Sequence, residues 1–184
     1  MVIKIGCDIT VHCEYRKDGV WHNCDNFEWD QETGKYEFYP IYDGRNYDLF
    51  GVLAGVRCND FPSIDVPRGL PKDMALKTKE MAEADLSWTH SHSYVTLREM
   101  LEWKRKRTKE WKKLKKKYVI KHDSREGDFI LDDSMYPTFK YEKHLLDYLI
   151  RRMKDKMGDH IYCFEKDDYY AKGDDFRIVF WFDN

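Results

Sequence analysis

The chain has 184 residues and a formal net charge of −2, and 16% of its residues are aromatic while 36% are charged. This aromatic content supplies enough apolar surface for a core, which excludes a wholly disordered chain, and the length fits a single domain over residues 1–184. No apolar run reaches the ~18–20 residues that a membrane helix needs, and the start of the chain lacks the pattern of a signal peptide. We therefore expect a soluble, cytoplasmic protein with no membrane partner.

The cysteines also indicate the compartment. There are five of them, widely spaced and without a C-x-x-C pair, which fits neither a disulfide framework nor a cysteine-type zinc site. We expect reduced thiols, most of which act as small buried apolar side chains.

The chain opens with strand patterns. Residues 1–15 alternate between apolar and polar side chains, as a strand with one buried face does. The ETGK sequence in the middle of residues 26–44 predicts a hairpin. The polar face of the first strand would carry four functional side chains in a row, which are Asp8, Thr10, His12 and Glu14.

Helices follow in the middle of the chain. Residues 46–57 predict a short helix that Asn46 or Asp48 could cap, and residues 77–88 predict a weak helical segment after a Pro-containing loop at 58–75. Thr96 and Glu99 form a capping box that begins a long basic helix at about 97–118.

A second amphipathic helix is predicted at about 139–157, with Thr138 as its cap and Gly158 at its end. Residues 122–137 are expected to be loop, and residues 160–165 and 176–182 read as strands. This order predicts an α+β domain with a mainly antiparallel sheet. The N-terminal and C-terminal strands should lie together, with the two long helices packed on the sheet.

The basic helix polarises the charge of the molecule. Residues 98–121 hold 12 basic and 3 acidic residues, whereas the rest of the chain holds 20 basic and 31 acidic residues. Such a run could follow a nucleic-acid backbone, but only Trp103 and Trp111 interrupt it, which is too sparse for base stacking. We therefore interpret it as a solvated face and do not expect a nucleic-acid partner.

Several segments together resemble a family of uncharacterised bacteriophage and prophage proteins. Its members open G-C-D-I-H, carry N-Y-D-L-F-x-x-L-A-x-V-R, P-R-G-L-P and H-S-H-S before an aromatic residue and x-T-L, and finish V-F-W-F-D-N. The matching segments here are 6–9, 46–57, 67–71, 90–97 and 179–184. One departure is Thr10, which stands at the family's histidine, with His12 two residues later on the same face. The resemblance implies a phage origin and a common site, and it names no reaction.

Two histidines one residue apart are the main candidates for chemistry. In WTHSHSYVTLREM, His90 and His92 would share one face of an extended segment just before the basic helix. The free N–H groups of a helix N-terminus suit an anion such as phosphate, and imidazole is the usual acid or base near neutral pH. A polar loop with histidines satisfied by their neighbours is the competing interpretation.

Other residues complete the predicted site. Asp8 would orient one imidazole, and Arg57 or Arg68 would hold phosphate, because a planar guanidinium binds oxygen atoms in pairs. Surface ion pairs are the alternative for both arginines. The remaining candidates for ligand contact are Thr10, His12, Glu14, Ser93 and Tyr94.

A divalent metal is conceivable but is not favoured. Histidine and aspartate are transition-metal ligands, yet the histidine pair would need a third ligand from Asp8, His12 or Glu14. Thr10 also breaks a ligand set that included the family's histidine. We therefore assign no metal ligand, and the cofactor stays open.

Two functions follow from these residues. The first is a phage-encoded enzyme that cleaves a phosphodiester or pyrophosphate bond in a small nucleotide, with His90 and His92 as acid and base, which would counter host immunity that signals through nucleotides. The second is a binding protein that sequesters such a nucleotide or inhibits a host defence protein. The same residues serve both functions, so the sequence leaves enzyme and binding protein open.

Overall fold

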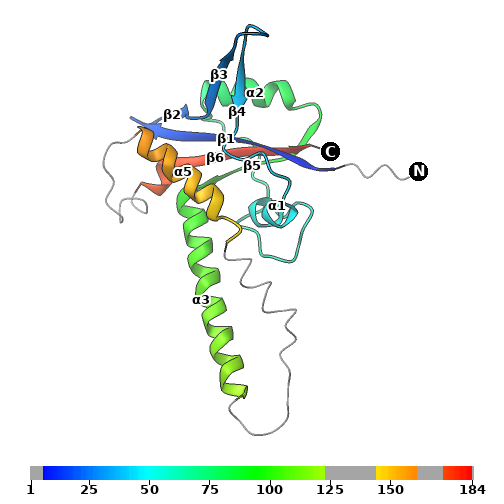
Figure 1. The fold of residues 1–184 in the computed structure, drawn as a ribbon, viewed down its shortest axis with the longest axis vertical. Helices are drawn as coiled ribbons and strands as arrows, with labels where there is room; N and C mark the ends of the chain where they lie inside the picture. The colour runs from blue at the N-terminus through cyan, green and yellow to red at the C-terminus, as the bar shows by residue number, and fades with distance from the viewer. Residues whose placement is uncertain (1–5, 123–143, 161–171, 184) are drawn as a thin grey trace, which may run out of the picture.

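The computed structural model describes residues 6–122, 144–160 and 172–183 (Figure 1). Within these ranges the chain forms an α+β single domain with a four-stranded antiparallel sheet, a separate two-stranded hairpin and four α-helices. In Figure 1 the sheet separates helices α1, α3 and α5 on one side from α2 and the hairpin on the other. The predicted fold class is therefore confirmed.

The sheet is built around the C-terminal strand. Its order is β2–β1–β6–β5, and neighbouring strands run antiparallel. The whole length of β6 pairs with β1, from Asp183 opposite Asp8 to Phe176 opposite Tyr15. The expectation that the first and last strands lie together is thus correct. The strands span Val20–Asn23 (β2), Asp8–Lys17 (β1), Phe176–Asp183 (β6) and Thr89–Thr96 (β5).

One face of the sheet carries the main core. Alternate residues of β1 and β6 point to this face, as a strand period of two requires. Helix α1 (Tyr47–Ala54), the first turns of α3 (Leu97–His122) and helix α5 (Asp147–His160) cover it. The buried side chains that meet here include Val11, Phe180, Phe182, Phe50, Leu53, Leu97, Met100, Leu149 and Met153.

Local sequence signals define the helix ends. Asn46 caps α1 by accepting a hydrogen bond from the backbone N–H of Leu49, and Gly55 ends it with a left-handed φ of 67°. At the start of α3, the Thr96 hydroxyl accepts from the Glu99 N–H while the Glu99 carboxylate accepts from the Thr96 N–H, at 3.2 and 2.8 Å. The capping box was predicted from the sequence, and Asn46 was one of the two caps, with Asp48, that the sequence left open for α1.

Helix α3 extends well beyond the sheet. Leu97, Met100 and Trp103 are buried against the core, but the rest of the helix projects away from the domain (Figure 1). Its 26 residues run to His122, four residues past the predicted end at 118. Only its first turns therefore pack on the sheet, unlike the predicted pair of long packed helices.

Helix α5 begins at Asp147, after a turn at 144–146, and continues to His160, past Gly158. The predicted loop covered residues 122–137, but His122 belongs to α3. The rest of this loop, the predicted cap at Thr138 and most of the predicted strand at 160–165 lie outside the described residues. Cys7, Cys13 and Cys24 are buried free thiols and Cys58 is half-buried, whereas Cys163 lies outside the described ranges. Among the described residues, no helix is long and apolar enough to cross a membrane.

The opposite face of the sheet is covered more thinly. Helix α2 (Leu76–Asp85) lies on it, and the hairpin of β3 (Asn26–Asp30) and β4 (Lys35–Tyr39) rises from it (Figure 1). Val179 and Trp181 of β6 pack there against Ala82 of α2. This face, which we call the polar face, also carries Asp8, Thr10, His12 and Glu14, because their register partners on β6 are Asp183, Trp181, Val179 and Arg177.

A buried ion network joins the polar face to the loop before α2. The Arg177 side chain is 4% exposed, and its Nε donates to the fully buried Glu14 carboxylate at 2.7 Å. The same guanidinium donates to Asp73 Oδ1 at 3.0 Å and to the Asp73 carbonyl at 3.3 Å. Glu14 also accepts from the Ala75 N–H at 2.9 Å. The network fixes residues 73–75 to β1 and β6.

We predict that Glu14→Ala lowers the free energy of unfolding by ~3–5 kcal/mol, because it leaves the buried Arg177 guanidinium without its principal counter-charge. Urea denaturation followed by circular dichroism measures the change. Glu83→Ala on α2 is the matched control, since that exposed carboxylate pairs with Lys79 only at 3.8 Å and should change stability by less than ~0.5 kcal/mol. Equal losses in the two variants would contradict the assigned role of the network.

Candidate ligand-binding site

The histidine pair does not form one site. Strand β5 has an irregularity between His90 and Ser93, and Ser91 within it has a left-handed φ of 50°. His90 stacks on Phe182 with ring centroids 6.0 Å apart, whereas His92 lies 6.4 Å from Trp181. Phe182 and Trp181 are consecutive in β6 and point to opposite faces of the sheet. The expectation that the two imidazoles share one face is therefore wrong, because the bulge reverses the alternation.

His92 lies on the polar face and is held in one tautomer. Its Nε2 is 2.9 Å from the Thr89 hydroxyl, which donates its own proton to the Asp85 carbonyl at 2.9 Å. Both contacts are satisfied only when His92 donates from Nε2. Burial and the neighbouring His90 lower the pKa of His92 below its ordinary value, so the neutral form is favoured in the fold.

His90 lies on the core side of the sheet. Its Nδ1 contacts the Ser91 hydroxyl at 2.9 Å, and its Nε2 is buried without a hydrogen-bond partner among the described residues. It therefore cannot act with His92 on one substrate atom.

His12 forms a second histidine arrangement, beneath the hairpin. Its Nδ1 lies 2.7 Å from the Asp25 carboxylate, and both side chains are fully buried. Asp25 also accepts from Asn23 Nδ2 and from the Cys13 N–H, at 2.7 and 2.8 Å. The imidazole stacks on Phe38 at 4.6 Å, and its Nε2 has no hydrogen-bond partner within the described part of the chain.

The start of β1 does not orient an imidazole. The exposed Asp8 carboxylate accepts from Arg45 Nε at 2.6 Å and also pairs with its Nη2, and this guanidinium lowers the pKa of Asp8. The predicted role of Asp8 beside a histidine therefore has no support in its contacts. Thr10 is half-buried opposite Trp181, whose indole lies 5.0 Å from His12 and separates the two polar-face histidines.

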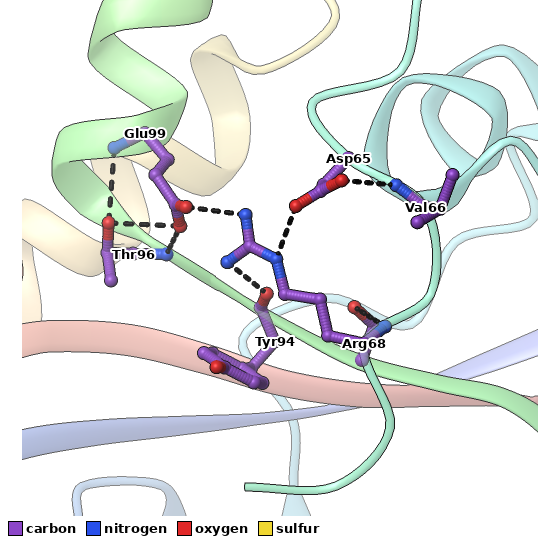
Figure 2. Close-up of polar contacts among 7 residues, drawn as sticks. Asp65, Val66, Arg68, Tyr94, Thr96 and Glu99 are labelled. Carbon is purple, nitrogen blue, oxygen red and sulfur yellow. Dashed lines mark hydrogen bonds and ion pairs between the residues drawn. The ribbon is translucent and has the colours of Figure 1, made fainter.

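The Arg68 side chain binds groups of the protein itself and is not free to hold a phosphate (Figure 2). Its Nε donates to Asp65 at 2.7 Å and its Nη2 donates to Glu99 at 2.6 Å. A third contact joins Nη1 to the Tyr94 carbonyl at 3.4 Å, and the guanidinium lies 5.3 Å from the Tyr94 ring. The hydrogen bond that Arg68 donates to Glu99 raises the pKa of Arg68, and Arg68 in turn lowers the pKa of Asp65.

Ser93 and Arg57, which were also predicted to contact a ligand, differ in their exposure to solvent. Ser93 is buried, and its hydroxyl accepts from the Arg68 N–H at 3.2 Å. Arg57 is exposed, with a left-handed φ of 63° just after α1. The structure thus brings Arg68, Ser93 and Tyr94 together.

An open cleft lies next to the contacts of Arg68, and Glu99 is part of its lining. Arg68 joins the loop that contains Asp65 to Glu99 in the first turn of α3, and the Trp103 indole donates to the Pro62 carbonyl at 2.9 Å. Between this loop and α3 lies a cleft of about 650 Å³, which is in the ~300–1,000 Å³ range of small-molecule sites. Its apolar lining comes from Pro62, Ile64 and Trp103.

The cleft carries more uncompensated positive than negative charge. Its lining includes the cations Arg105, Lys106, Arg107 and Lys109 and the carboxylates Glu99, Glu102 and Glu110. Glu99 is neutralised by Arg68, and Glu110 pairs with Arg107. Arg105, Lys106 and Lys109 are exposed along α3 and face only Glu102 among the remaining lining charges. An anionic ligand could replace water at these cations.

Sequence reasoning missed this cleft. The run KRKRTKEWKK was interpreted as a solvated face, because the sequence does not show that the loop at 62–65 folds against it. The motif PRGLP did single out Arg68, but it gave no sign that Arg68 binds the capping-box glutamate.

Two further findings bear on identity. The described residues contain no group of three or more His, Cys, Asp or Glu side chains arranged to hold a metal ion. No family model matches the chain, and no match was found among curated proteins or solved structures.

The lowered pKa of His92 predicts how stability depends on pH. Between its ordinary pKa of ~6.5 and its lower value in the fold, the unfolded chain binds more protons, so the free energy of unfolding falls as the pH drops through this window. We expect His92→Gln, which can keep the hydrogen bond to Thr89, to reduce this slope. Urea unfolding of the wild type and of the variant between pH 5 and 8 measures how the free energy of unfolding changes with pH. Identical slopes in the two proteins would show that His92 does not contribute.

Proposed function

We propose that this chain is a phage-encoded protein that binds a small nucleotide in the cleft beside α3 and withholds it without cleaving it. The observation that carries the proposal is the cleft itself, which combines three exposed cations with an apolar floor. Phosphate groups would contact Arg105, Lys106 and Lys109, and the base would lie against Pro62 and Ile64. Charged hydrogen bonds and apolar contact are the usual combination at such sites.

The arrangement of the histidines weighs against a hydrolase. General acid and base must both reach the reacting atoms, whereas His90 and His92 point to opposite sides of a sheet. His12 has a carboxylate partner, but it is fully buried, so a substrate would have to displace the hairpin to reach it. Cleavage of a phosphodiester or pyrophosphate bond by the histidine pair is therefore the weaker hypothesis.

The phage origin rests on the resemblance of the motif segments to phage and prophage proteins. In that setting the protein would act in the cytoplasm of the infected bacterium. Binding of a nucleotide signal there would lower its free concentration and weaken a host defence that depends on it. A nucleic-acid partner is not proposed, because the basic run of α3 holds only Trp103 and Trp111 as aromatic residues, which are too few for base stacking.

We predict that ATP or cyclic di-AMP binds the wild-type protein and that Lys106→Gln with Lys109→Gln weakens binding about tenfold or more, since charged hydrogen bonds contribute ~1.5–3 kcal/mol each. Isothermal titration calorimetry measures the affinity. The matched control is Lys112→Gln with Lys113→Gln, which removes the same charge from exposed positions farther along α3 and should leave affinity within about twofold.

Product analysis separates binding from catalysis. Incubating the protein with both nucleotides, with and without a chelator, should leave them intact when they are recovered after denaturation. Turnover that His92→Ala abolishes would establish an enzyme and contradict the proposal. Equal losses of affinity in the two lysine pairs would mean that the helix attracts anions in general and that the cleft is not a site.

A further inference from the structure

The hairpin formed by β3 and β4 packs on the domain only at its base. Phe38 stacks on His12 at 4.6 Å, and Phe27 lies 5.6 Å from Phe38. Farther out, Trp29 and Tyr36 contact each other at 5.1 Å but are 55% and 68% exposed. In Figure 1 this outer half rises clear of the sheet. Two large aromatic side chains are thus held in place at the tip with most of their surface in water.

The two faces of the hairpin differ in chemistry. Residues directly opposite each other share a face, so the register places Phe27 with Phe38 and Trp29 with Tyr36 on one side. The other side pairs Asn26 with Tyr39, Glu28 with Glu37 and Asp30 with Lys35. Glu28 and Glu37 are both exposed, and like charges in directly opposed positions destabilise a strand pair. The Tyr39 hydroxyl donates to Glu37 at 3.1 Å, but this neutral donor does not offset the repulsion between the two charges.

The hairpin also has free edges. The small sheet contains β3 and β4 alone within the described ranges, and an isolated two-stranded ribbon is marginally stable in water. Each outer edge offers a row of backbone N–H and C=O groups that can pair with a further strand.

We propose that the outer half of the hairpin takes up an extended segment of a partner protein as a third strand. The segment has Arg or Lys alternating with apolar residues. In that register, a cation lies opposite the nearer carboxylate of the Glu28 and Glu37 pair, while the apolar residues on the other face of the strand lie beside the nearer ring of the Trp29 and Tyr36 pair. The added strand would thus form hydrogen bonds with the backbone edge, bring positive charge to the carboxylate pair and cover part of the exposed aromatic pair.

The same charges select against a second copy of this chain. Edge-to-edge pairing of two hairpins would bring the Glu28 and Glu37 row of one copy beside that of the other, and charge on an edge strand is how proteins avoid such pairing. Residues 26–39 hold four carboxylates and one lysine, so complementarity points to a cationic partner. This inference does not depend on nucleotide binding, because the hairpin and helix α3, whose residues line the cleft, lie on opposite sides of the sheet (Figure 1).

The test uses two labelled octapeptides, one in which arginine and valine alternate and one with four arginines followed by four valines. Fluorescence anisotropy should show the alternating peptide binding the full-length protein at least about fivefold tighter, because only alternation fits both faces. Glu28→Gln with Glu37→Gln should remove that preference. This double variant relieves a repulsion, so loss of binding cannot be attributed to melting of the hairpin.

Trp29→Ala should also weaken the alternating peptide about fivefold or more, and Glu83→Gln on α2 serves as a control for general charge. Equal affinity for the two peptides, or an unchanged preference in the glutamine double variant, would overturn the proposal. Concentration-dependent dimerisation that Trp29→Ala abolishes, measured by sedimentation, would assign the surface to a second copy and would overturn it too.

Discussion

The buried guanidinium of Arg177 is the interaction on which the polar face depends. It lies on β6, one of the two inner strands of the sheet, and its charge is balanced by Glu14 from β1 and Asp73 from the loop before α2. An uncompensated charge at that depth would be costly, so the loop must return to the sheet for the fold to be stable. The ion network thus determines where residues 73–75 lie.

The position of that loop shapes the rest of the site. Because its end is fixed at Asp73, its beginning brings Arg68 across β5 to the first turn of α3, where Glu99 and Asp65 bind it (Figure 2). Glu99 is also the capping residue of the helix. One carboxylate therefore begins the helix and anchors the loop, and the cleft between loop and helix follows from these two contacts.

Some charged side chains pair within the protein and others are exposed to solvent, and only the exposed ones are available to a ligand. The charged groups that the sequence singles out, Asp8, Glu14 and Arg68, already bind partners within the chain. The cations available to an anion are instead on the exposed side of α3, and the carboxylates available to a cationic partner are on the hairpin. The polarised composition thus corresponds to two surfaces on opposite sides of the sheet.

Sequence patterns predicted the helices and strands, but they did not predict how the side chains of the site are arranged. Alternation predicted the face shared by Asp8, Thr10, His12 and Glu14, and Asn46 and the capping box predicted helix starts, because these signals are local. The bulge at Ser91 carries no such signal, since a left-handed φ is usual for glycine and not for serine.

The sequence also did not predict the hydrogen-bond partners of Arg68 and His12. Arg68 and Glu99 are 31 residues apart, and the partner of His12 comes from the turn after β2. Such contacts depend on how the loops return to the sheet, which a single sequence does not reveal. The residue types at the site were therefore predictable, but their pairing was not.

The location of the ligand can be read from the indole N–H signals of the tryptophans. Trp103 donates to Pro62 beside the cleft, Trp181 donates to Asp85 on the polar face near His92, and Trp29 is exposed on the hairpin. Titrating ¹⁵N-labelled protein with ATP or cyclic di-AMP should shift the Trp103 signal and leave Trp181 and Trp29 in place. A shift of Trp181 without Trp103 would place the ligand at the histidines and contradict the account.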